Sequence, residues 1–466
     1  MTAPVVELDA LARRFGEAAA VREAERDVSY AALAESVAAR ARALSAAGLE
    51  PGARVALACG ADVATIVDAL ALLSLGCAIL PVSSAAPASD TDRLAALFGA
   101  AWCLGGAPVA GPRRRSVESR EIARAPAPEP AGARKPAPES AIVLALPSSG
   151  STGPPKMILK SAAQVRAAIE IYARSVALVP GDRVLAVVPF EHSYGFVNVL
   201  CGTIACGGTL ILPGTTHPRA VAEAARRGGA SLLPGAPLFF DLMTKFEGAH
   251  AAPLGLRAAI SVGTVLSRRA RDEFAAAFRV PLWQSYGASE AGPVALNAAE
   301  TVDGEMMALG RPCDGVEVAV LDESGAPVGD GEEGEIVVRS PAIALGCSRA
   351  GRFFTGDLGC LHGGVLAFRG RLKLLIAAAG RKVDPHEVEE VLRGHEAIDD
   401  AAVVAELGPD GRETVKAIVV ARAPLGVLDV TDFCARRLAP HKVPRVVEFR
   451  ASLPCGALGK LLRDQL

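Results

Sequence analysis

One segment of the sequence combines residue types that bind anions: residues 148–156, which read SSGSTGPPK. Its glycines allow the backbone to approach an anion closely, and the hydroxyl groups beside them can donate hydrogen bonds to phosphate oxygens. Lys156 adds a positive charge. The pattern is not a Walker loop, which requires G-x-x-x-x-G-K followed by Ser or Thr. Taken alone, the segment could equally be an ordinary turn, so its meaning depends on the other motifs.

Two further segments offer groups that could complete a nucleotide site. Residues 286–290, YGASE, follow an apolar strand-like run and provide an aromatic face for a base, a hydroxyl for phosphate and a carboxylate for a metal. Thr355-Gly356-Asp357 places a carboxylate in what we expect to be a tight turn, where it would suit the two hydroxyls of a ribose. Either segment alone could be structural, as a packed tyrosine beside a solvated glutamate or as an Asx turn.

Together these three motifs resemble the adenylate-forming superfamily, which contains acyl-CoA and aryl-CoA synthetases, the adenylation domains of peptide synthetases and beetle luciferases. The resemblance continues to the carboxyl end. Residues 370–373 look like the family's hinge motif, residues 380–389 like the loop and helix after it, and residues 454–460 like the catalytic-lysine segment. The motifs follow the family's order over residues 28–466, an agreement that chance does not readily produce.

The resemblance implies a first step in which a substrate carboxylate attacks the α-phosphorus of ATP, so that charge neutralisation and positioning dominate catalysis. Glu290 with Ser151 would hold Mg²⁺, and Lys460 would lie where negative charge builds between the carboxylate and the α-phosphate. Asp357, assisted by Arg371, would fix the ribose. The implied ATP- and AMP-binding residues are Ser148, Ser149, Gly150, Ser151, Thr152, Gly153, Lys156, Tyr286, Gly287, Ser289, Asp357, Arg371 and Lys460.

The resemblance also implies a second step, in which a thiol attacks the acyl-adenylate and AMP leaves. The family performs both steps in one site by rotating its small domain about a hinge, and Lys373 occupies the hinge position here. Rotation would withdraw Lys460 and bring the loop at residues 380–383 towards the site. The thiol would come from coenzyme A or from the phosphopantetheine arm of a carrier protein.

Residues 189–195, PFEHSYG, carry information about the acid. Amino-acid-activating relatives have an Asp in this segment that pairs with the substrate ammonium. Here His192 resembles acyl- and aryl-CoA ligases, where a His or an aromatic residue borders the acyl pocket and can gate thiol entry, although Glu191 could be mistaken for an ammonium partner and His192 could be structural. The expected catalytic residues are Lys460, Glu290 and His192, and the expected acid pocket consists of His192, Tyr194, Phe239, Val262, Gly263, Thr264 and Gln284.

Several residues depart from the family pattern. Leu374 follows the hinge where relatives usually have an acidic residue, which could alter the balance between the two domain orientations. Cys455-Gly456 replaces the usual Arg-Thr before the catalytic lysine, and Ser289 replaces a commoner Thr but keeps the hydroxyl. The altered surroundings of Lys460 and Leu374 leave a non-catalytic nucleotide- or acyl-binding homologue as an alternative, and Phe239 could equally belong to the core.

Composition excludes other classes of protein. Among 466 residues, 49 Lys and Arg balance 51 Asp and Glu for a net charge of −2, which argues against a nucleic-acid partner and a polybasic membrane anchor. A hydrophobic content of 51% excludes disorder as the main state. Residues 1–20 lack the pattern of a signal peptide, and ten cysteines show no Cys-x-x-Cys pair, so we expect reduced thiols and a cytoplasmic protein.

The most apolar stretch, Val63–Val82, contains Asp68, Gly76 and Pro81, so we expect a helix followed by a buried strand and no membrane span. Residues 107–140 are rich in Pro, Arg and Ala and predict a surface connection. The remaining expected helices are 31–47, 219–227, 386–393 and 430–438, and the expected strands are 54–58, 142–146, 184–188, 208–212, 259–262, 282–285, 401–406 and 414–421.

These elements must position the motifs, and their alternation predicts an α/β fold. We expect a large domain over residues 1–370, made of layered α/β subdomains and a small antiparallel β unit, followed by a small mobile α+β domain over residues 371–466. The favoured hypothesis is an AMP-forming ligase that joins a non-amino acyl or aryl acid to a thiol, most simply coenzyme A. A stand-alone enzyme that loads a carrier protein is the alternative. The sequence does not indicate an oligomeric state.

Overall fold

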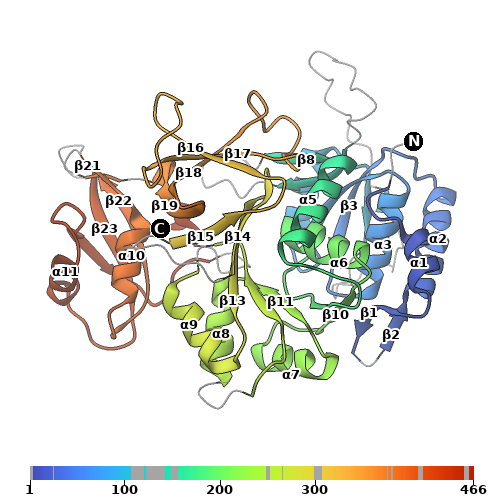
Figure 1. The fold of residues 1–466 in the computed structure, drawn as a ribbon, viewed down its shortest axis with the longest axis horizontal. Coiled ribbons are helices and arrows are strands. Elements are labelled where there is room, and N and C mark those ends of the chain that lie inside the picture. The colour runs from blue at the N-terminus through green and yellow to red at the C-terminus, as the bar shows by residue number, and fades with distance from the viewer. Residues whose placement is uncertain are drawn as a thin grey trace.

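The computed structural model describes residues 4–24, 26–105, 120–121, 142–147, 156–247, 252–264, 266–298, 307–374, 376–378, 381–407, 413–455 and 461–466. Within this part of the chain, a large amino-terminal unit is followed by a smaller carboxy-terminal one, which lies at the left of Figure 1 in orange and red. This arrangement confirms the expected fold class. The predicted phosphate-binding residues 148–155 and the predicted catalytic Lys460 lie outside the described residues.

The large unit contains two sheets. The first has six strands in the order β6-β5-β3-β4-β7-β8, and the second has thirteen in the order β16-β17-β18-β19-β15-β14-β13-β12-β11-β9-β10-β1-β2. The strands of the first sheet are β3 (Arg54–Cys59), β4 (Ala78–Ser83), β5 (Trp102–Leu104), β6 (Arg120–Glu121), β7 (Ile142–Pro147) and β8 (Met157–Ser161). The strands of the second are β1 (Ala19–Glu23), β2 (Arg26–Ser29), β9 (Arg183–Leu185), β10 (Thr209–Leu212), β11 (Leu232–Gly235), β12 (Ala258–Ser261), β13 (Leu282–Ala288), β14 (Gly292–Asn297), β15 (Met307–Pro312), β16 (Glu317–Leu321), β17 (Gly334–Arg339), β18 (Phe353–His362) and β19 (Val365–Arg371).

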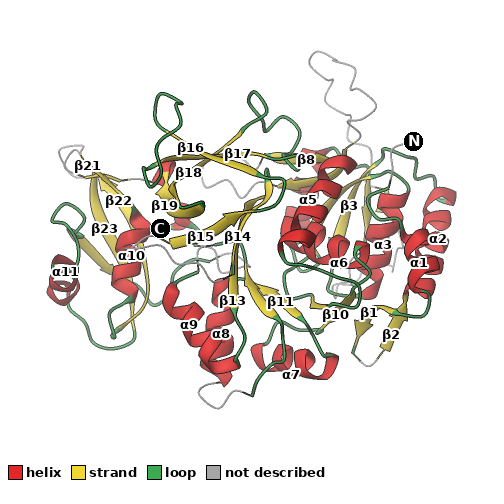
Figure 2. Ribbon diagram, in the orientation of Figure 1, coloured by secondary structure: helices red, strands yellow, loops and turns green. Residues whose placement is uncertain are grey.

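Helices cover both faces of these sheets, as Figure 2 shows in red. They are α1 (Leu8–Phe15), α2 (Tyr30–Ala46), α3 (Val63–Ser74), α4 (Ala88–Phe98), α5 (Ala162–Ser175), α6 (Gly202–Ala205), α7 (Pro218–Gly228), α8 (Pro237–Glu247) and α9 (Arg268–Phe278). Successive residues of a strand point to opposite faces, and the cores follow this rule. Val55 and Leu57 join the central core, whereas Ala56 between them packs with Phe98 of α4. The large unit is therefore layered, with its main core between the two sheets.

The apolar stretch at residues 63–82 forms the expected helix and strand. Helix α3 begins after Asp62, whose side chain accepts a hydrogen bond from the backbone N–H of Thr65, and it is buried on most sides because it lies within the central core. The carboxylate of Asp68 accepts a 2.5 Å hydrogen bond from Arg40 of α2, so its charge is paired. Among the described residues, no helix has the length and apolar character needed to cross a membrane.

Some expectations about single elements need correction. Strand β9 ends at Leu185 rather than at Val188, and the following chain leads into a π-helix at Tyr194–Cys201 that the sequence did not suggest. Thr355–Asp357 lies inside strand β18 rather than in a tight turn, with Gly356 at φ +72° beside irregular register between β17 and β18. A left-handed backbone in a strand produces a bulge, and a bulge re-aims the neighbouring side chain.

The carboxy-terminal unit has its own core, formed by residues between Ile376 and Leu438. A three-stranded sheet in the order β22-β23-β24 packs against α10, and a two-stranded sheet β20-β21 lies beside it. Helix α11 begins at Val427 and ends at Ala435, earlier than the expected 430–438. The elements are β20 (Ile376–Ala378), β21 (Arg381–Val383), α10 (Pro385–Arg393), β22 (Ile398–Leu407), β23 (Glu413–Ala421), α11 (Val427–Ala435) and β24 (Val446–Phe449).

Candidate active site

Asp357 stands at the centre of the described part of the site. Its side chain is 5% exposed, and its two carboxylate oxygens have different partners. Oδ1 accepts a 2.8 Å hydrogen bond from Nε of Arg371, and Oδ2 accepts a 2.7 Å hydrogen bond from the hydroxyl of Tyr286. Each carboxylate oxygen can accept a second hydrogen bond, so the pair retains acceptor capacity for the hydroxyls of a ligand. The structure thus brings together three residues that the sequence assigned to one nucleotide site.

Sheet pairing explains how these three residues meet. Asp357 of β18 lies directly opposite Arg371 of β19, so their contact follows from the register of that hairpin. Backbone contacts hold the strand in place, since the N–H of Asp357 donates to the Thr355 hydroxyl at 3.0 Å and that hydroxyl donates to the carbonyl of Ile336 at 2.8 Å. Tyr286 reaches the same place from β13 across the same continuous sheet.

Local geometry at β13 requires a glycine after Tyr286. The register between β13 and β14 shifts at Tyr286 and Gly287, and a Cβ atom on Gly287 would lie 2.5 Å from the carbonyl oxygen of Gly292. Burial, reinforced by the Asp357 carboxylate, raises the pKa of Tyr286 well above its ordinary value of 10.0. The phenol therefore stays protonated and acts as the donor to Asp357, while its ring remains available to border a flat ligand.

The turn after Tyr286 is fastened to the strand that follows the predicted phosphate-binding segment. The carbonyl of Glu290 accepts a 2.7 Å hydrogen bond from the N–H of Ala344, and Leu345 donates to the carbonyl of Leu159 in β8 at 2.8 Å. Residues 342–345 thus connect β8 with the turn that carries Ser289 and Glu290. This connection was not evident from the sequence, because residues 342–345 match none of the motifs.

Lys160 of β8 is a second feature that the sequence did not single out. It is 1% exposed, and its ammonium group donates a 2.6 Å hydrogen bond to the carbonyl of Ala342. Burial lowers its pKa from 10.5 to about 8, although the nearby Glu290 and Cys347 act in the opposite direction. A buried positive charge therefore lies close to the carboxylate that the sequence assigned to Mg²⁺.

The donor set around Glu290 is compatible with Mg²⁺. Mg²⁺ is usually held by one or two carboxylates together with substrate phosphates and water, rather than by a complete protein cage. In the described part of the chain there is no cluster of three or more His, Cys, Asp or Glu side chains suited to a metal. A single carboxylate at Glu290 therefore fits a metal that arrives with phosphates better than a metal held by the protein alone.

Three residues of the expected acid pocket, Val262, Gly263 and Thr264, follow β12 directly, and Gln284 of β13 lies opposite Ser261, the last residue of β12. Gly235, Ser261 and Gln284 stand side by side in the parallel register of these strands, and open α/β sheets bind ligands at this edge. Val262 and Gln284 are buried, whereas Gly263 and Thr264 are exposed. The Ser261 hydroxyl is buried and has no hydrogen-bond partner among the described residues.

His192 also presents an unpartnered group. Its Nε2 is buried without a hydrogen-bond partner among the described residues, and its backbone N–H donates to the carbonyl of Pro189 at 3.1 Å. Burial lowers the pKa of His192 below 6.5, while Glu191 acts against this shift. A neutral imidazole with a free ring nitrogen can face an apolar substrate without adding a charge.

Two residues of the expected acid pocket pack into the protein interior. The ring of Tyr194 makes an edge-on contact with Tyr172 at 5.5 Å between centroids, and burial raises the pKa of Tyr194 well above 10.0. Phe239 is partly buried and packs on Phe240, which is fully buried beside Phe274 of α9. Phe240 is therefore a core residue. Phe239 lies between that core and Gly235, where a Cβ atom on residue 235 would lie 2.9 Å from the Phe239 ring.

A short connection at the expected hinge position joins the two units of the chain. After Arg371, residues Leu372–Leu374 form a 3-10 turn that contains the backbone of Lys373. Gly370 faces Asp384, and a Cβ atom on Gly370 would lie 2.7 Å from that carboxylate. Only a residue without a side chain permits this approach between β19 and the start of α10.

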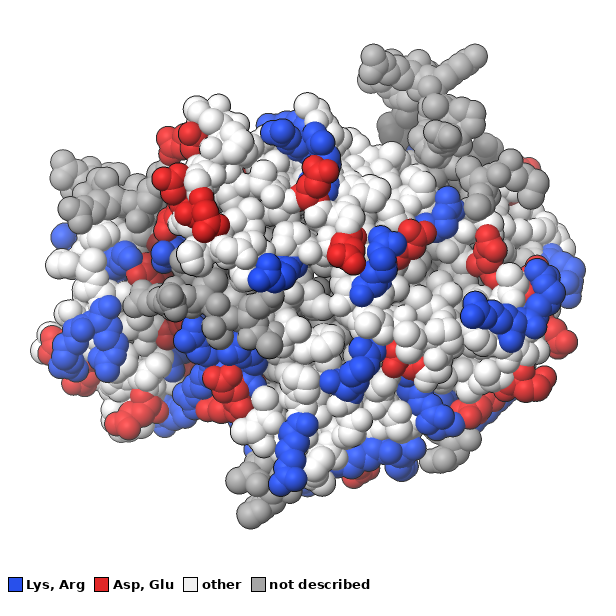
Figure 3. Space-filling model, viewed as in Figure 1, with Lys and Arg blue, Asp and Glu red and all other residues white. Residues whose placement is uncertain are grey.

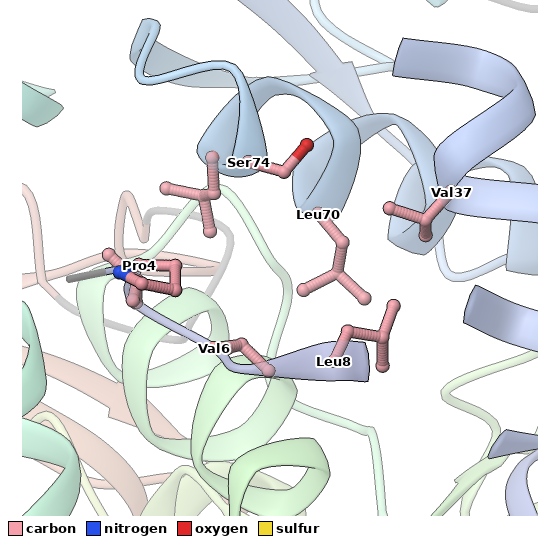
Figure 4. A pocket seen from close by; sticks show the side chains of 8 residues that line it. Pro4, Val6, Leu8, Val37, Leu70 and Ser74 are labelled. Atoms are coloured by element: carbon pink, nitrogen blue, oxygen red, sulfur yellow. The ribbon is translucent and has the colours of Figure 1, made fainter. Parts of the chain in front are cut away.

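Two hollows elsewhere in the described chain differ from this site. Figure 4 shows a cavity of about 20 Å³ between the amino terminus and α3, lined by apolar residues such as Val6 and Leu70, which holds no more than about one water molecule. A shallow hollow of about 210 Å³ lies near Arg22 and Arg227 beside β10. On the face drawn in Figure 3, positive and negative side chains are interspersed, in keeping with the net charge of −2.

Comparison with known proteins defines the class of this chain. The model for AMP-binding enzymes matches residues 8–347, and the model for the AMP-binding enzyme C-terminal domain matches residues 387–460. Fold and motif order identify an AMP-forming acid–thiol ligase, as the sequence predicted. The chain belongs to the AMP-binding enzyme family.

Individual relatives support this assignment. The chain is 29% identical over 481 residues to a feruloyl-CoA synthase of an Amycolatopsis species, covering 98% of this chain and 96% of the relative. It is 32% identical over 350 residues to a long-chain-fatty-acid–CoA ligase of Bacillus subtilis, covering 71% of this chain and 62% of the relative, which is less than two thirds of that protein's length.

Solved structures show the same fold. An o-succinylbenzoate CoA synthetase from Bacillus subtilis in complex with its acyl-adenylate intermediate has a TM-score of 0.86 at 21% identity, covering 100% of this chain and 98% of that one. An amide bond synthetase from Marinactinospora thermotolerans has a TM-score of 0.81 at 27% identity, covering 97% and 98%.

Proposed function

We propose that this enzyme uses ATP to adenylate a non-amino acyl or aryl acid and then transfers the acyl group to a thiol, with coenzyme A as the preferred acceptor. The observation that carries the proposal is the buried Asp357 carboxylate held between Tyr286 and Arg371. A carboxylate fixed at both oxygens, beside an aromatic ring, is suited to bind the ribose of ATP while the ring borders the adenine.

The proposed phosphate contacts come from the segment between β7 and β8 and from the turn after Tyr286. Residues 148–153 would supply backbone N–H and hydroxyl groups, with Lys156 and Ser289 adding further donors. Glu290 and Ser151 would hold Mg²⁺, which offsets the negative charge of the phosphates when bound. Lys460 would place its ammonium group where the substrate carboxylate meets the α-phosphate, because negative charge is greatest there.

The proposed acid lacks an ammonium group. Glu191 is the carboxylate that could pair with one, but it acts on Cys59, whose thiol pKa is raised mainly by burial and further by Glu191. Glu191 also acts electrostatically on His192, its neighbour in the expected acid pocket. The neutral His192, the unpartnered Ser261 hydroxyl and the buried Gln284 offer uncharged groups instead. Feruloyl-CoA and benzoate–CoA ligases among the relatives support an aryl acid as the first class to test.

The two steps would use two orientations of the small domain about Lys373, with the domain boundary at residues 370 and 371. A carrier protein is the alternative thiol source, since its phosphopantetheine arm presents the same reactive group. We also propose that the enzyme acts in the cytoplasm, where ATP and coenzyme A are available. A homologue that binds nucleotide without turnover is the remaining alternative.

Pyrophosphate exchange into ATP tests the first step directly. A panel of acetate, malonate, hexadecanoate, benzoate and ferulate should give exchange with at least one acid, and Lys460→Ala should abolish it. Exchange with no acid, in protein that still binds ATP in calorimetry, would favour the non-catalytic homologue. Acyl-CoA measured by chromatography, and the mass of an added carrier protein, then distinguish the two acceptors. A parallel reaction with an amine covers the activity named for the similar amide bond synthetase.

A further inference from the structure

Glu389 of α10 is a buried carboxylate for which the proposed chemistry has no use. It is 1% exposed, deep in the core of the carboxy-terminal unit. An unpaired carboxylate there would be costly, so its partners show what it does. Burial by itself raises its pKa, but a hydrogen bond from His386 and the guanidinium groups of Arg463 and Arg393 outweigh burial and lower the pKa to about 2.

The carboxylate is fully engaged. Oε1 accepts hydrogen bonds from the backbone N–H of Val403 at 2.8 Å and from Arg463 at 2.5 Å. Oε2 lies 3.1 Å from Nδ1 of His386 and 3.6 Å from a guanidinium nitrogen of Arg393. One side chain therefore ties together the start of α10, the end of α10, strand β22 and the last residues of the chain.

Arg463 completes this arrangement from the other side. Its side chain is 13% exposed, and its second guanidinium nitrogen donates a 2.6 Å hydrogen bond to the carbonyl of Val403. The two side chains thus bond to both backbone groups of Val403. A guanidinium fork can make two directed bonds of this kind at once, whereas an ammonium group cannot.

The chain before Arg463 is also fixed. Leu461 forms an isolated β-bridge with Cys455, and the N–H of Leu462 donates to the carbonyl of Pro454 at 2.9 Å. The five residues 456–460 therefore connect two paired positions. Arg463 follows the predicted catalytic Lys460 by only three residues, so the fastened position is close to it in sequence.

We propose that Glu389 and Arg463 are positioning residues for the adenylation step, because they fasten the base of the connection that carries Lys460 to α10 and β22. This inference rests on the proposed function. A catalytic group displaced by about 1 Å can lose a hundredfold in rate, so a fixed base has a direct kinetic consequence. Thiol transfer has no need of Lys460 in the proposed two-step scheme, so the positioning role belongs to the first step alone.

The test compares the two steps in Arg463→Gln, with Arg422→Gln as the matched control. Arg422 lies in the same unit and pairs at 3.3 Å with Asp399 on the surface, where both side chains are about half exposed. Pyrophosphate exchange with the most active acid of the panel measures adenylation. Release of AMP from the synthetic adenylate of that acid on addition of coenzyme A measures thiol transfer. Hydrogen exchange of peptides covering residues 450–466 reports the fastening without reference to activity.

We expect Arg463→Gln to lower kcat for pyrophosphate exchange at least tenfold, with the KM for ATP changed less than twofold. The rate of thiol transfer should stay within twofold of the wild type. Hydrogen exchange at residues 461–466 should become faster. Arg463→Lys, which keeps the charge but loses the fork, should recover part of the rate. Arg422→Gln should behave as the wild type.

Equal rate losses in adenylation and thiol transfer would mean that Arg463 only stabilises the domain. Pyrophosphate exchange at the wild-type rate would mean that Arg463 neither positions Lys460 nor stabilises the domain. Either result overturns the inference. Should Arg463→Gln fail to fold, the same criteria apply to Arg463→Lys. If the wild type itself gives no exchange with any acid, the proposed function fails first, and unchanged hydrogen exchange in the variant would separately refute the fastening.

Discussion

Replacing Glu389 by Gln should destabilise the carboxy-terminal unit by about 3 kcal/mol near pH 7. The pKa of Glu389 falls from its ordinary 4.5 to about 2 on folding, and a tenfold change in an equilibrium constant is worth about 1.4 kcal/mol. Mutations of buried ion pairs give a similar free energy, since removing one member of such a pair costs about 3–5 kcal/mol. The amide would leave the guanidinium groups of Arg463 and Arg393 without their buried counter-charge.

The pH dependence provides a second check on the sign. Because the folded-state pKa is depressed, the contribution of Glu389 is present above pH 4.5 and is lost as pH falls from about 4.5 towards about 2. The stability difference between wild type and Glu389→Gln should therefore narrow by about 1 kcal/mol as the pH falls from 6 to 4.

Hydrogen exchange followed by mass spectrometry is the suitable assay, because both tryptophans, Trp102 and Trp283, belong to the large unit and do not report on the small one. The free energy of opening is measured for peptides from α10 and β22. Glu387→Gln, two residues earlier on α10, is the matched control, since Glu387 pairs with Lys442 where both side chains are about one quarter exposed. A loss below about 1 kcal/mol for Glu389→Gln, or equal losses in both variants, would refute the reasoning.

Three further predictions concern single residues, two in the large unit and one at the start of α10. Asp357→Asn should lower kcat/KM for ATP in pyrophosphate exchange by about ten- to a hundredfold, the worth of a hydrogen bond to a charged group, and an unchanged value would exclude a ribose contact. The pKa of Lys160, lowered to about 8 by burial, should make wild-type stability rise between pH 8 and 10.5, and calorimetry of Lys160→Met should show no such rise. The pKa of Asp384, raised to about 6 by burial against the opposing effect of His386, should make stability fall as pH rises from 4 to 6, and urea titrations of Asp384→Asn should lack that fall.

Much of the fold could be predicted from local patterns. Helix α3 and strand β4 follow from an apolar run with breaks at Gly76 and Pro81, and α10 follows from the Asp384 cap and Pro385. The π-helix at Tyr194–Cys201 could not be predicted in this way, because its apolar sequence fits an ordinary buried helix equally well. The end of strand β9 could not be predicted either, because tertiary packing decides where its pairing with β10 and β11 stops.

The candidate site, like the fold, has a part that the sequence predicted and a part that it did not. Motifs indicated Tyr286, Asp357 and Arg371 individually. Their mutual contacts could not be predicted, because Tyr286 and Asp357 are 71 positions apart in sequence and meet only through the order of strands in the second sheet. The buried Lys160 escaped notice because a lysine in a short strand usually marks an exposed position. The contact between the rings of Tyr194 and Tyr172 was also not predicted, because it depends on how the π-helix packs against α5.

The contacts also separate binding from chemistry. Tyr286, Asp357 and Arg371 belong to strands of one continuous sheet, and its strand order and pairing bring together the groups proposed to hold the ribose. Glu389 of α10 and Arg463 instead bond to Val403 of β22 in the carboxy-terminal unit, which has its own core and follows the short connection after Arg371. In the proposed two-step scheme, the ribose-binding groups would retain the adenylate while Lys460 moves, because Lys460 would be anchored separately through Glu389 and Arg463.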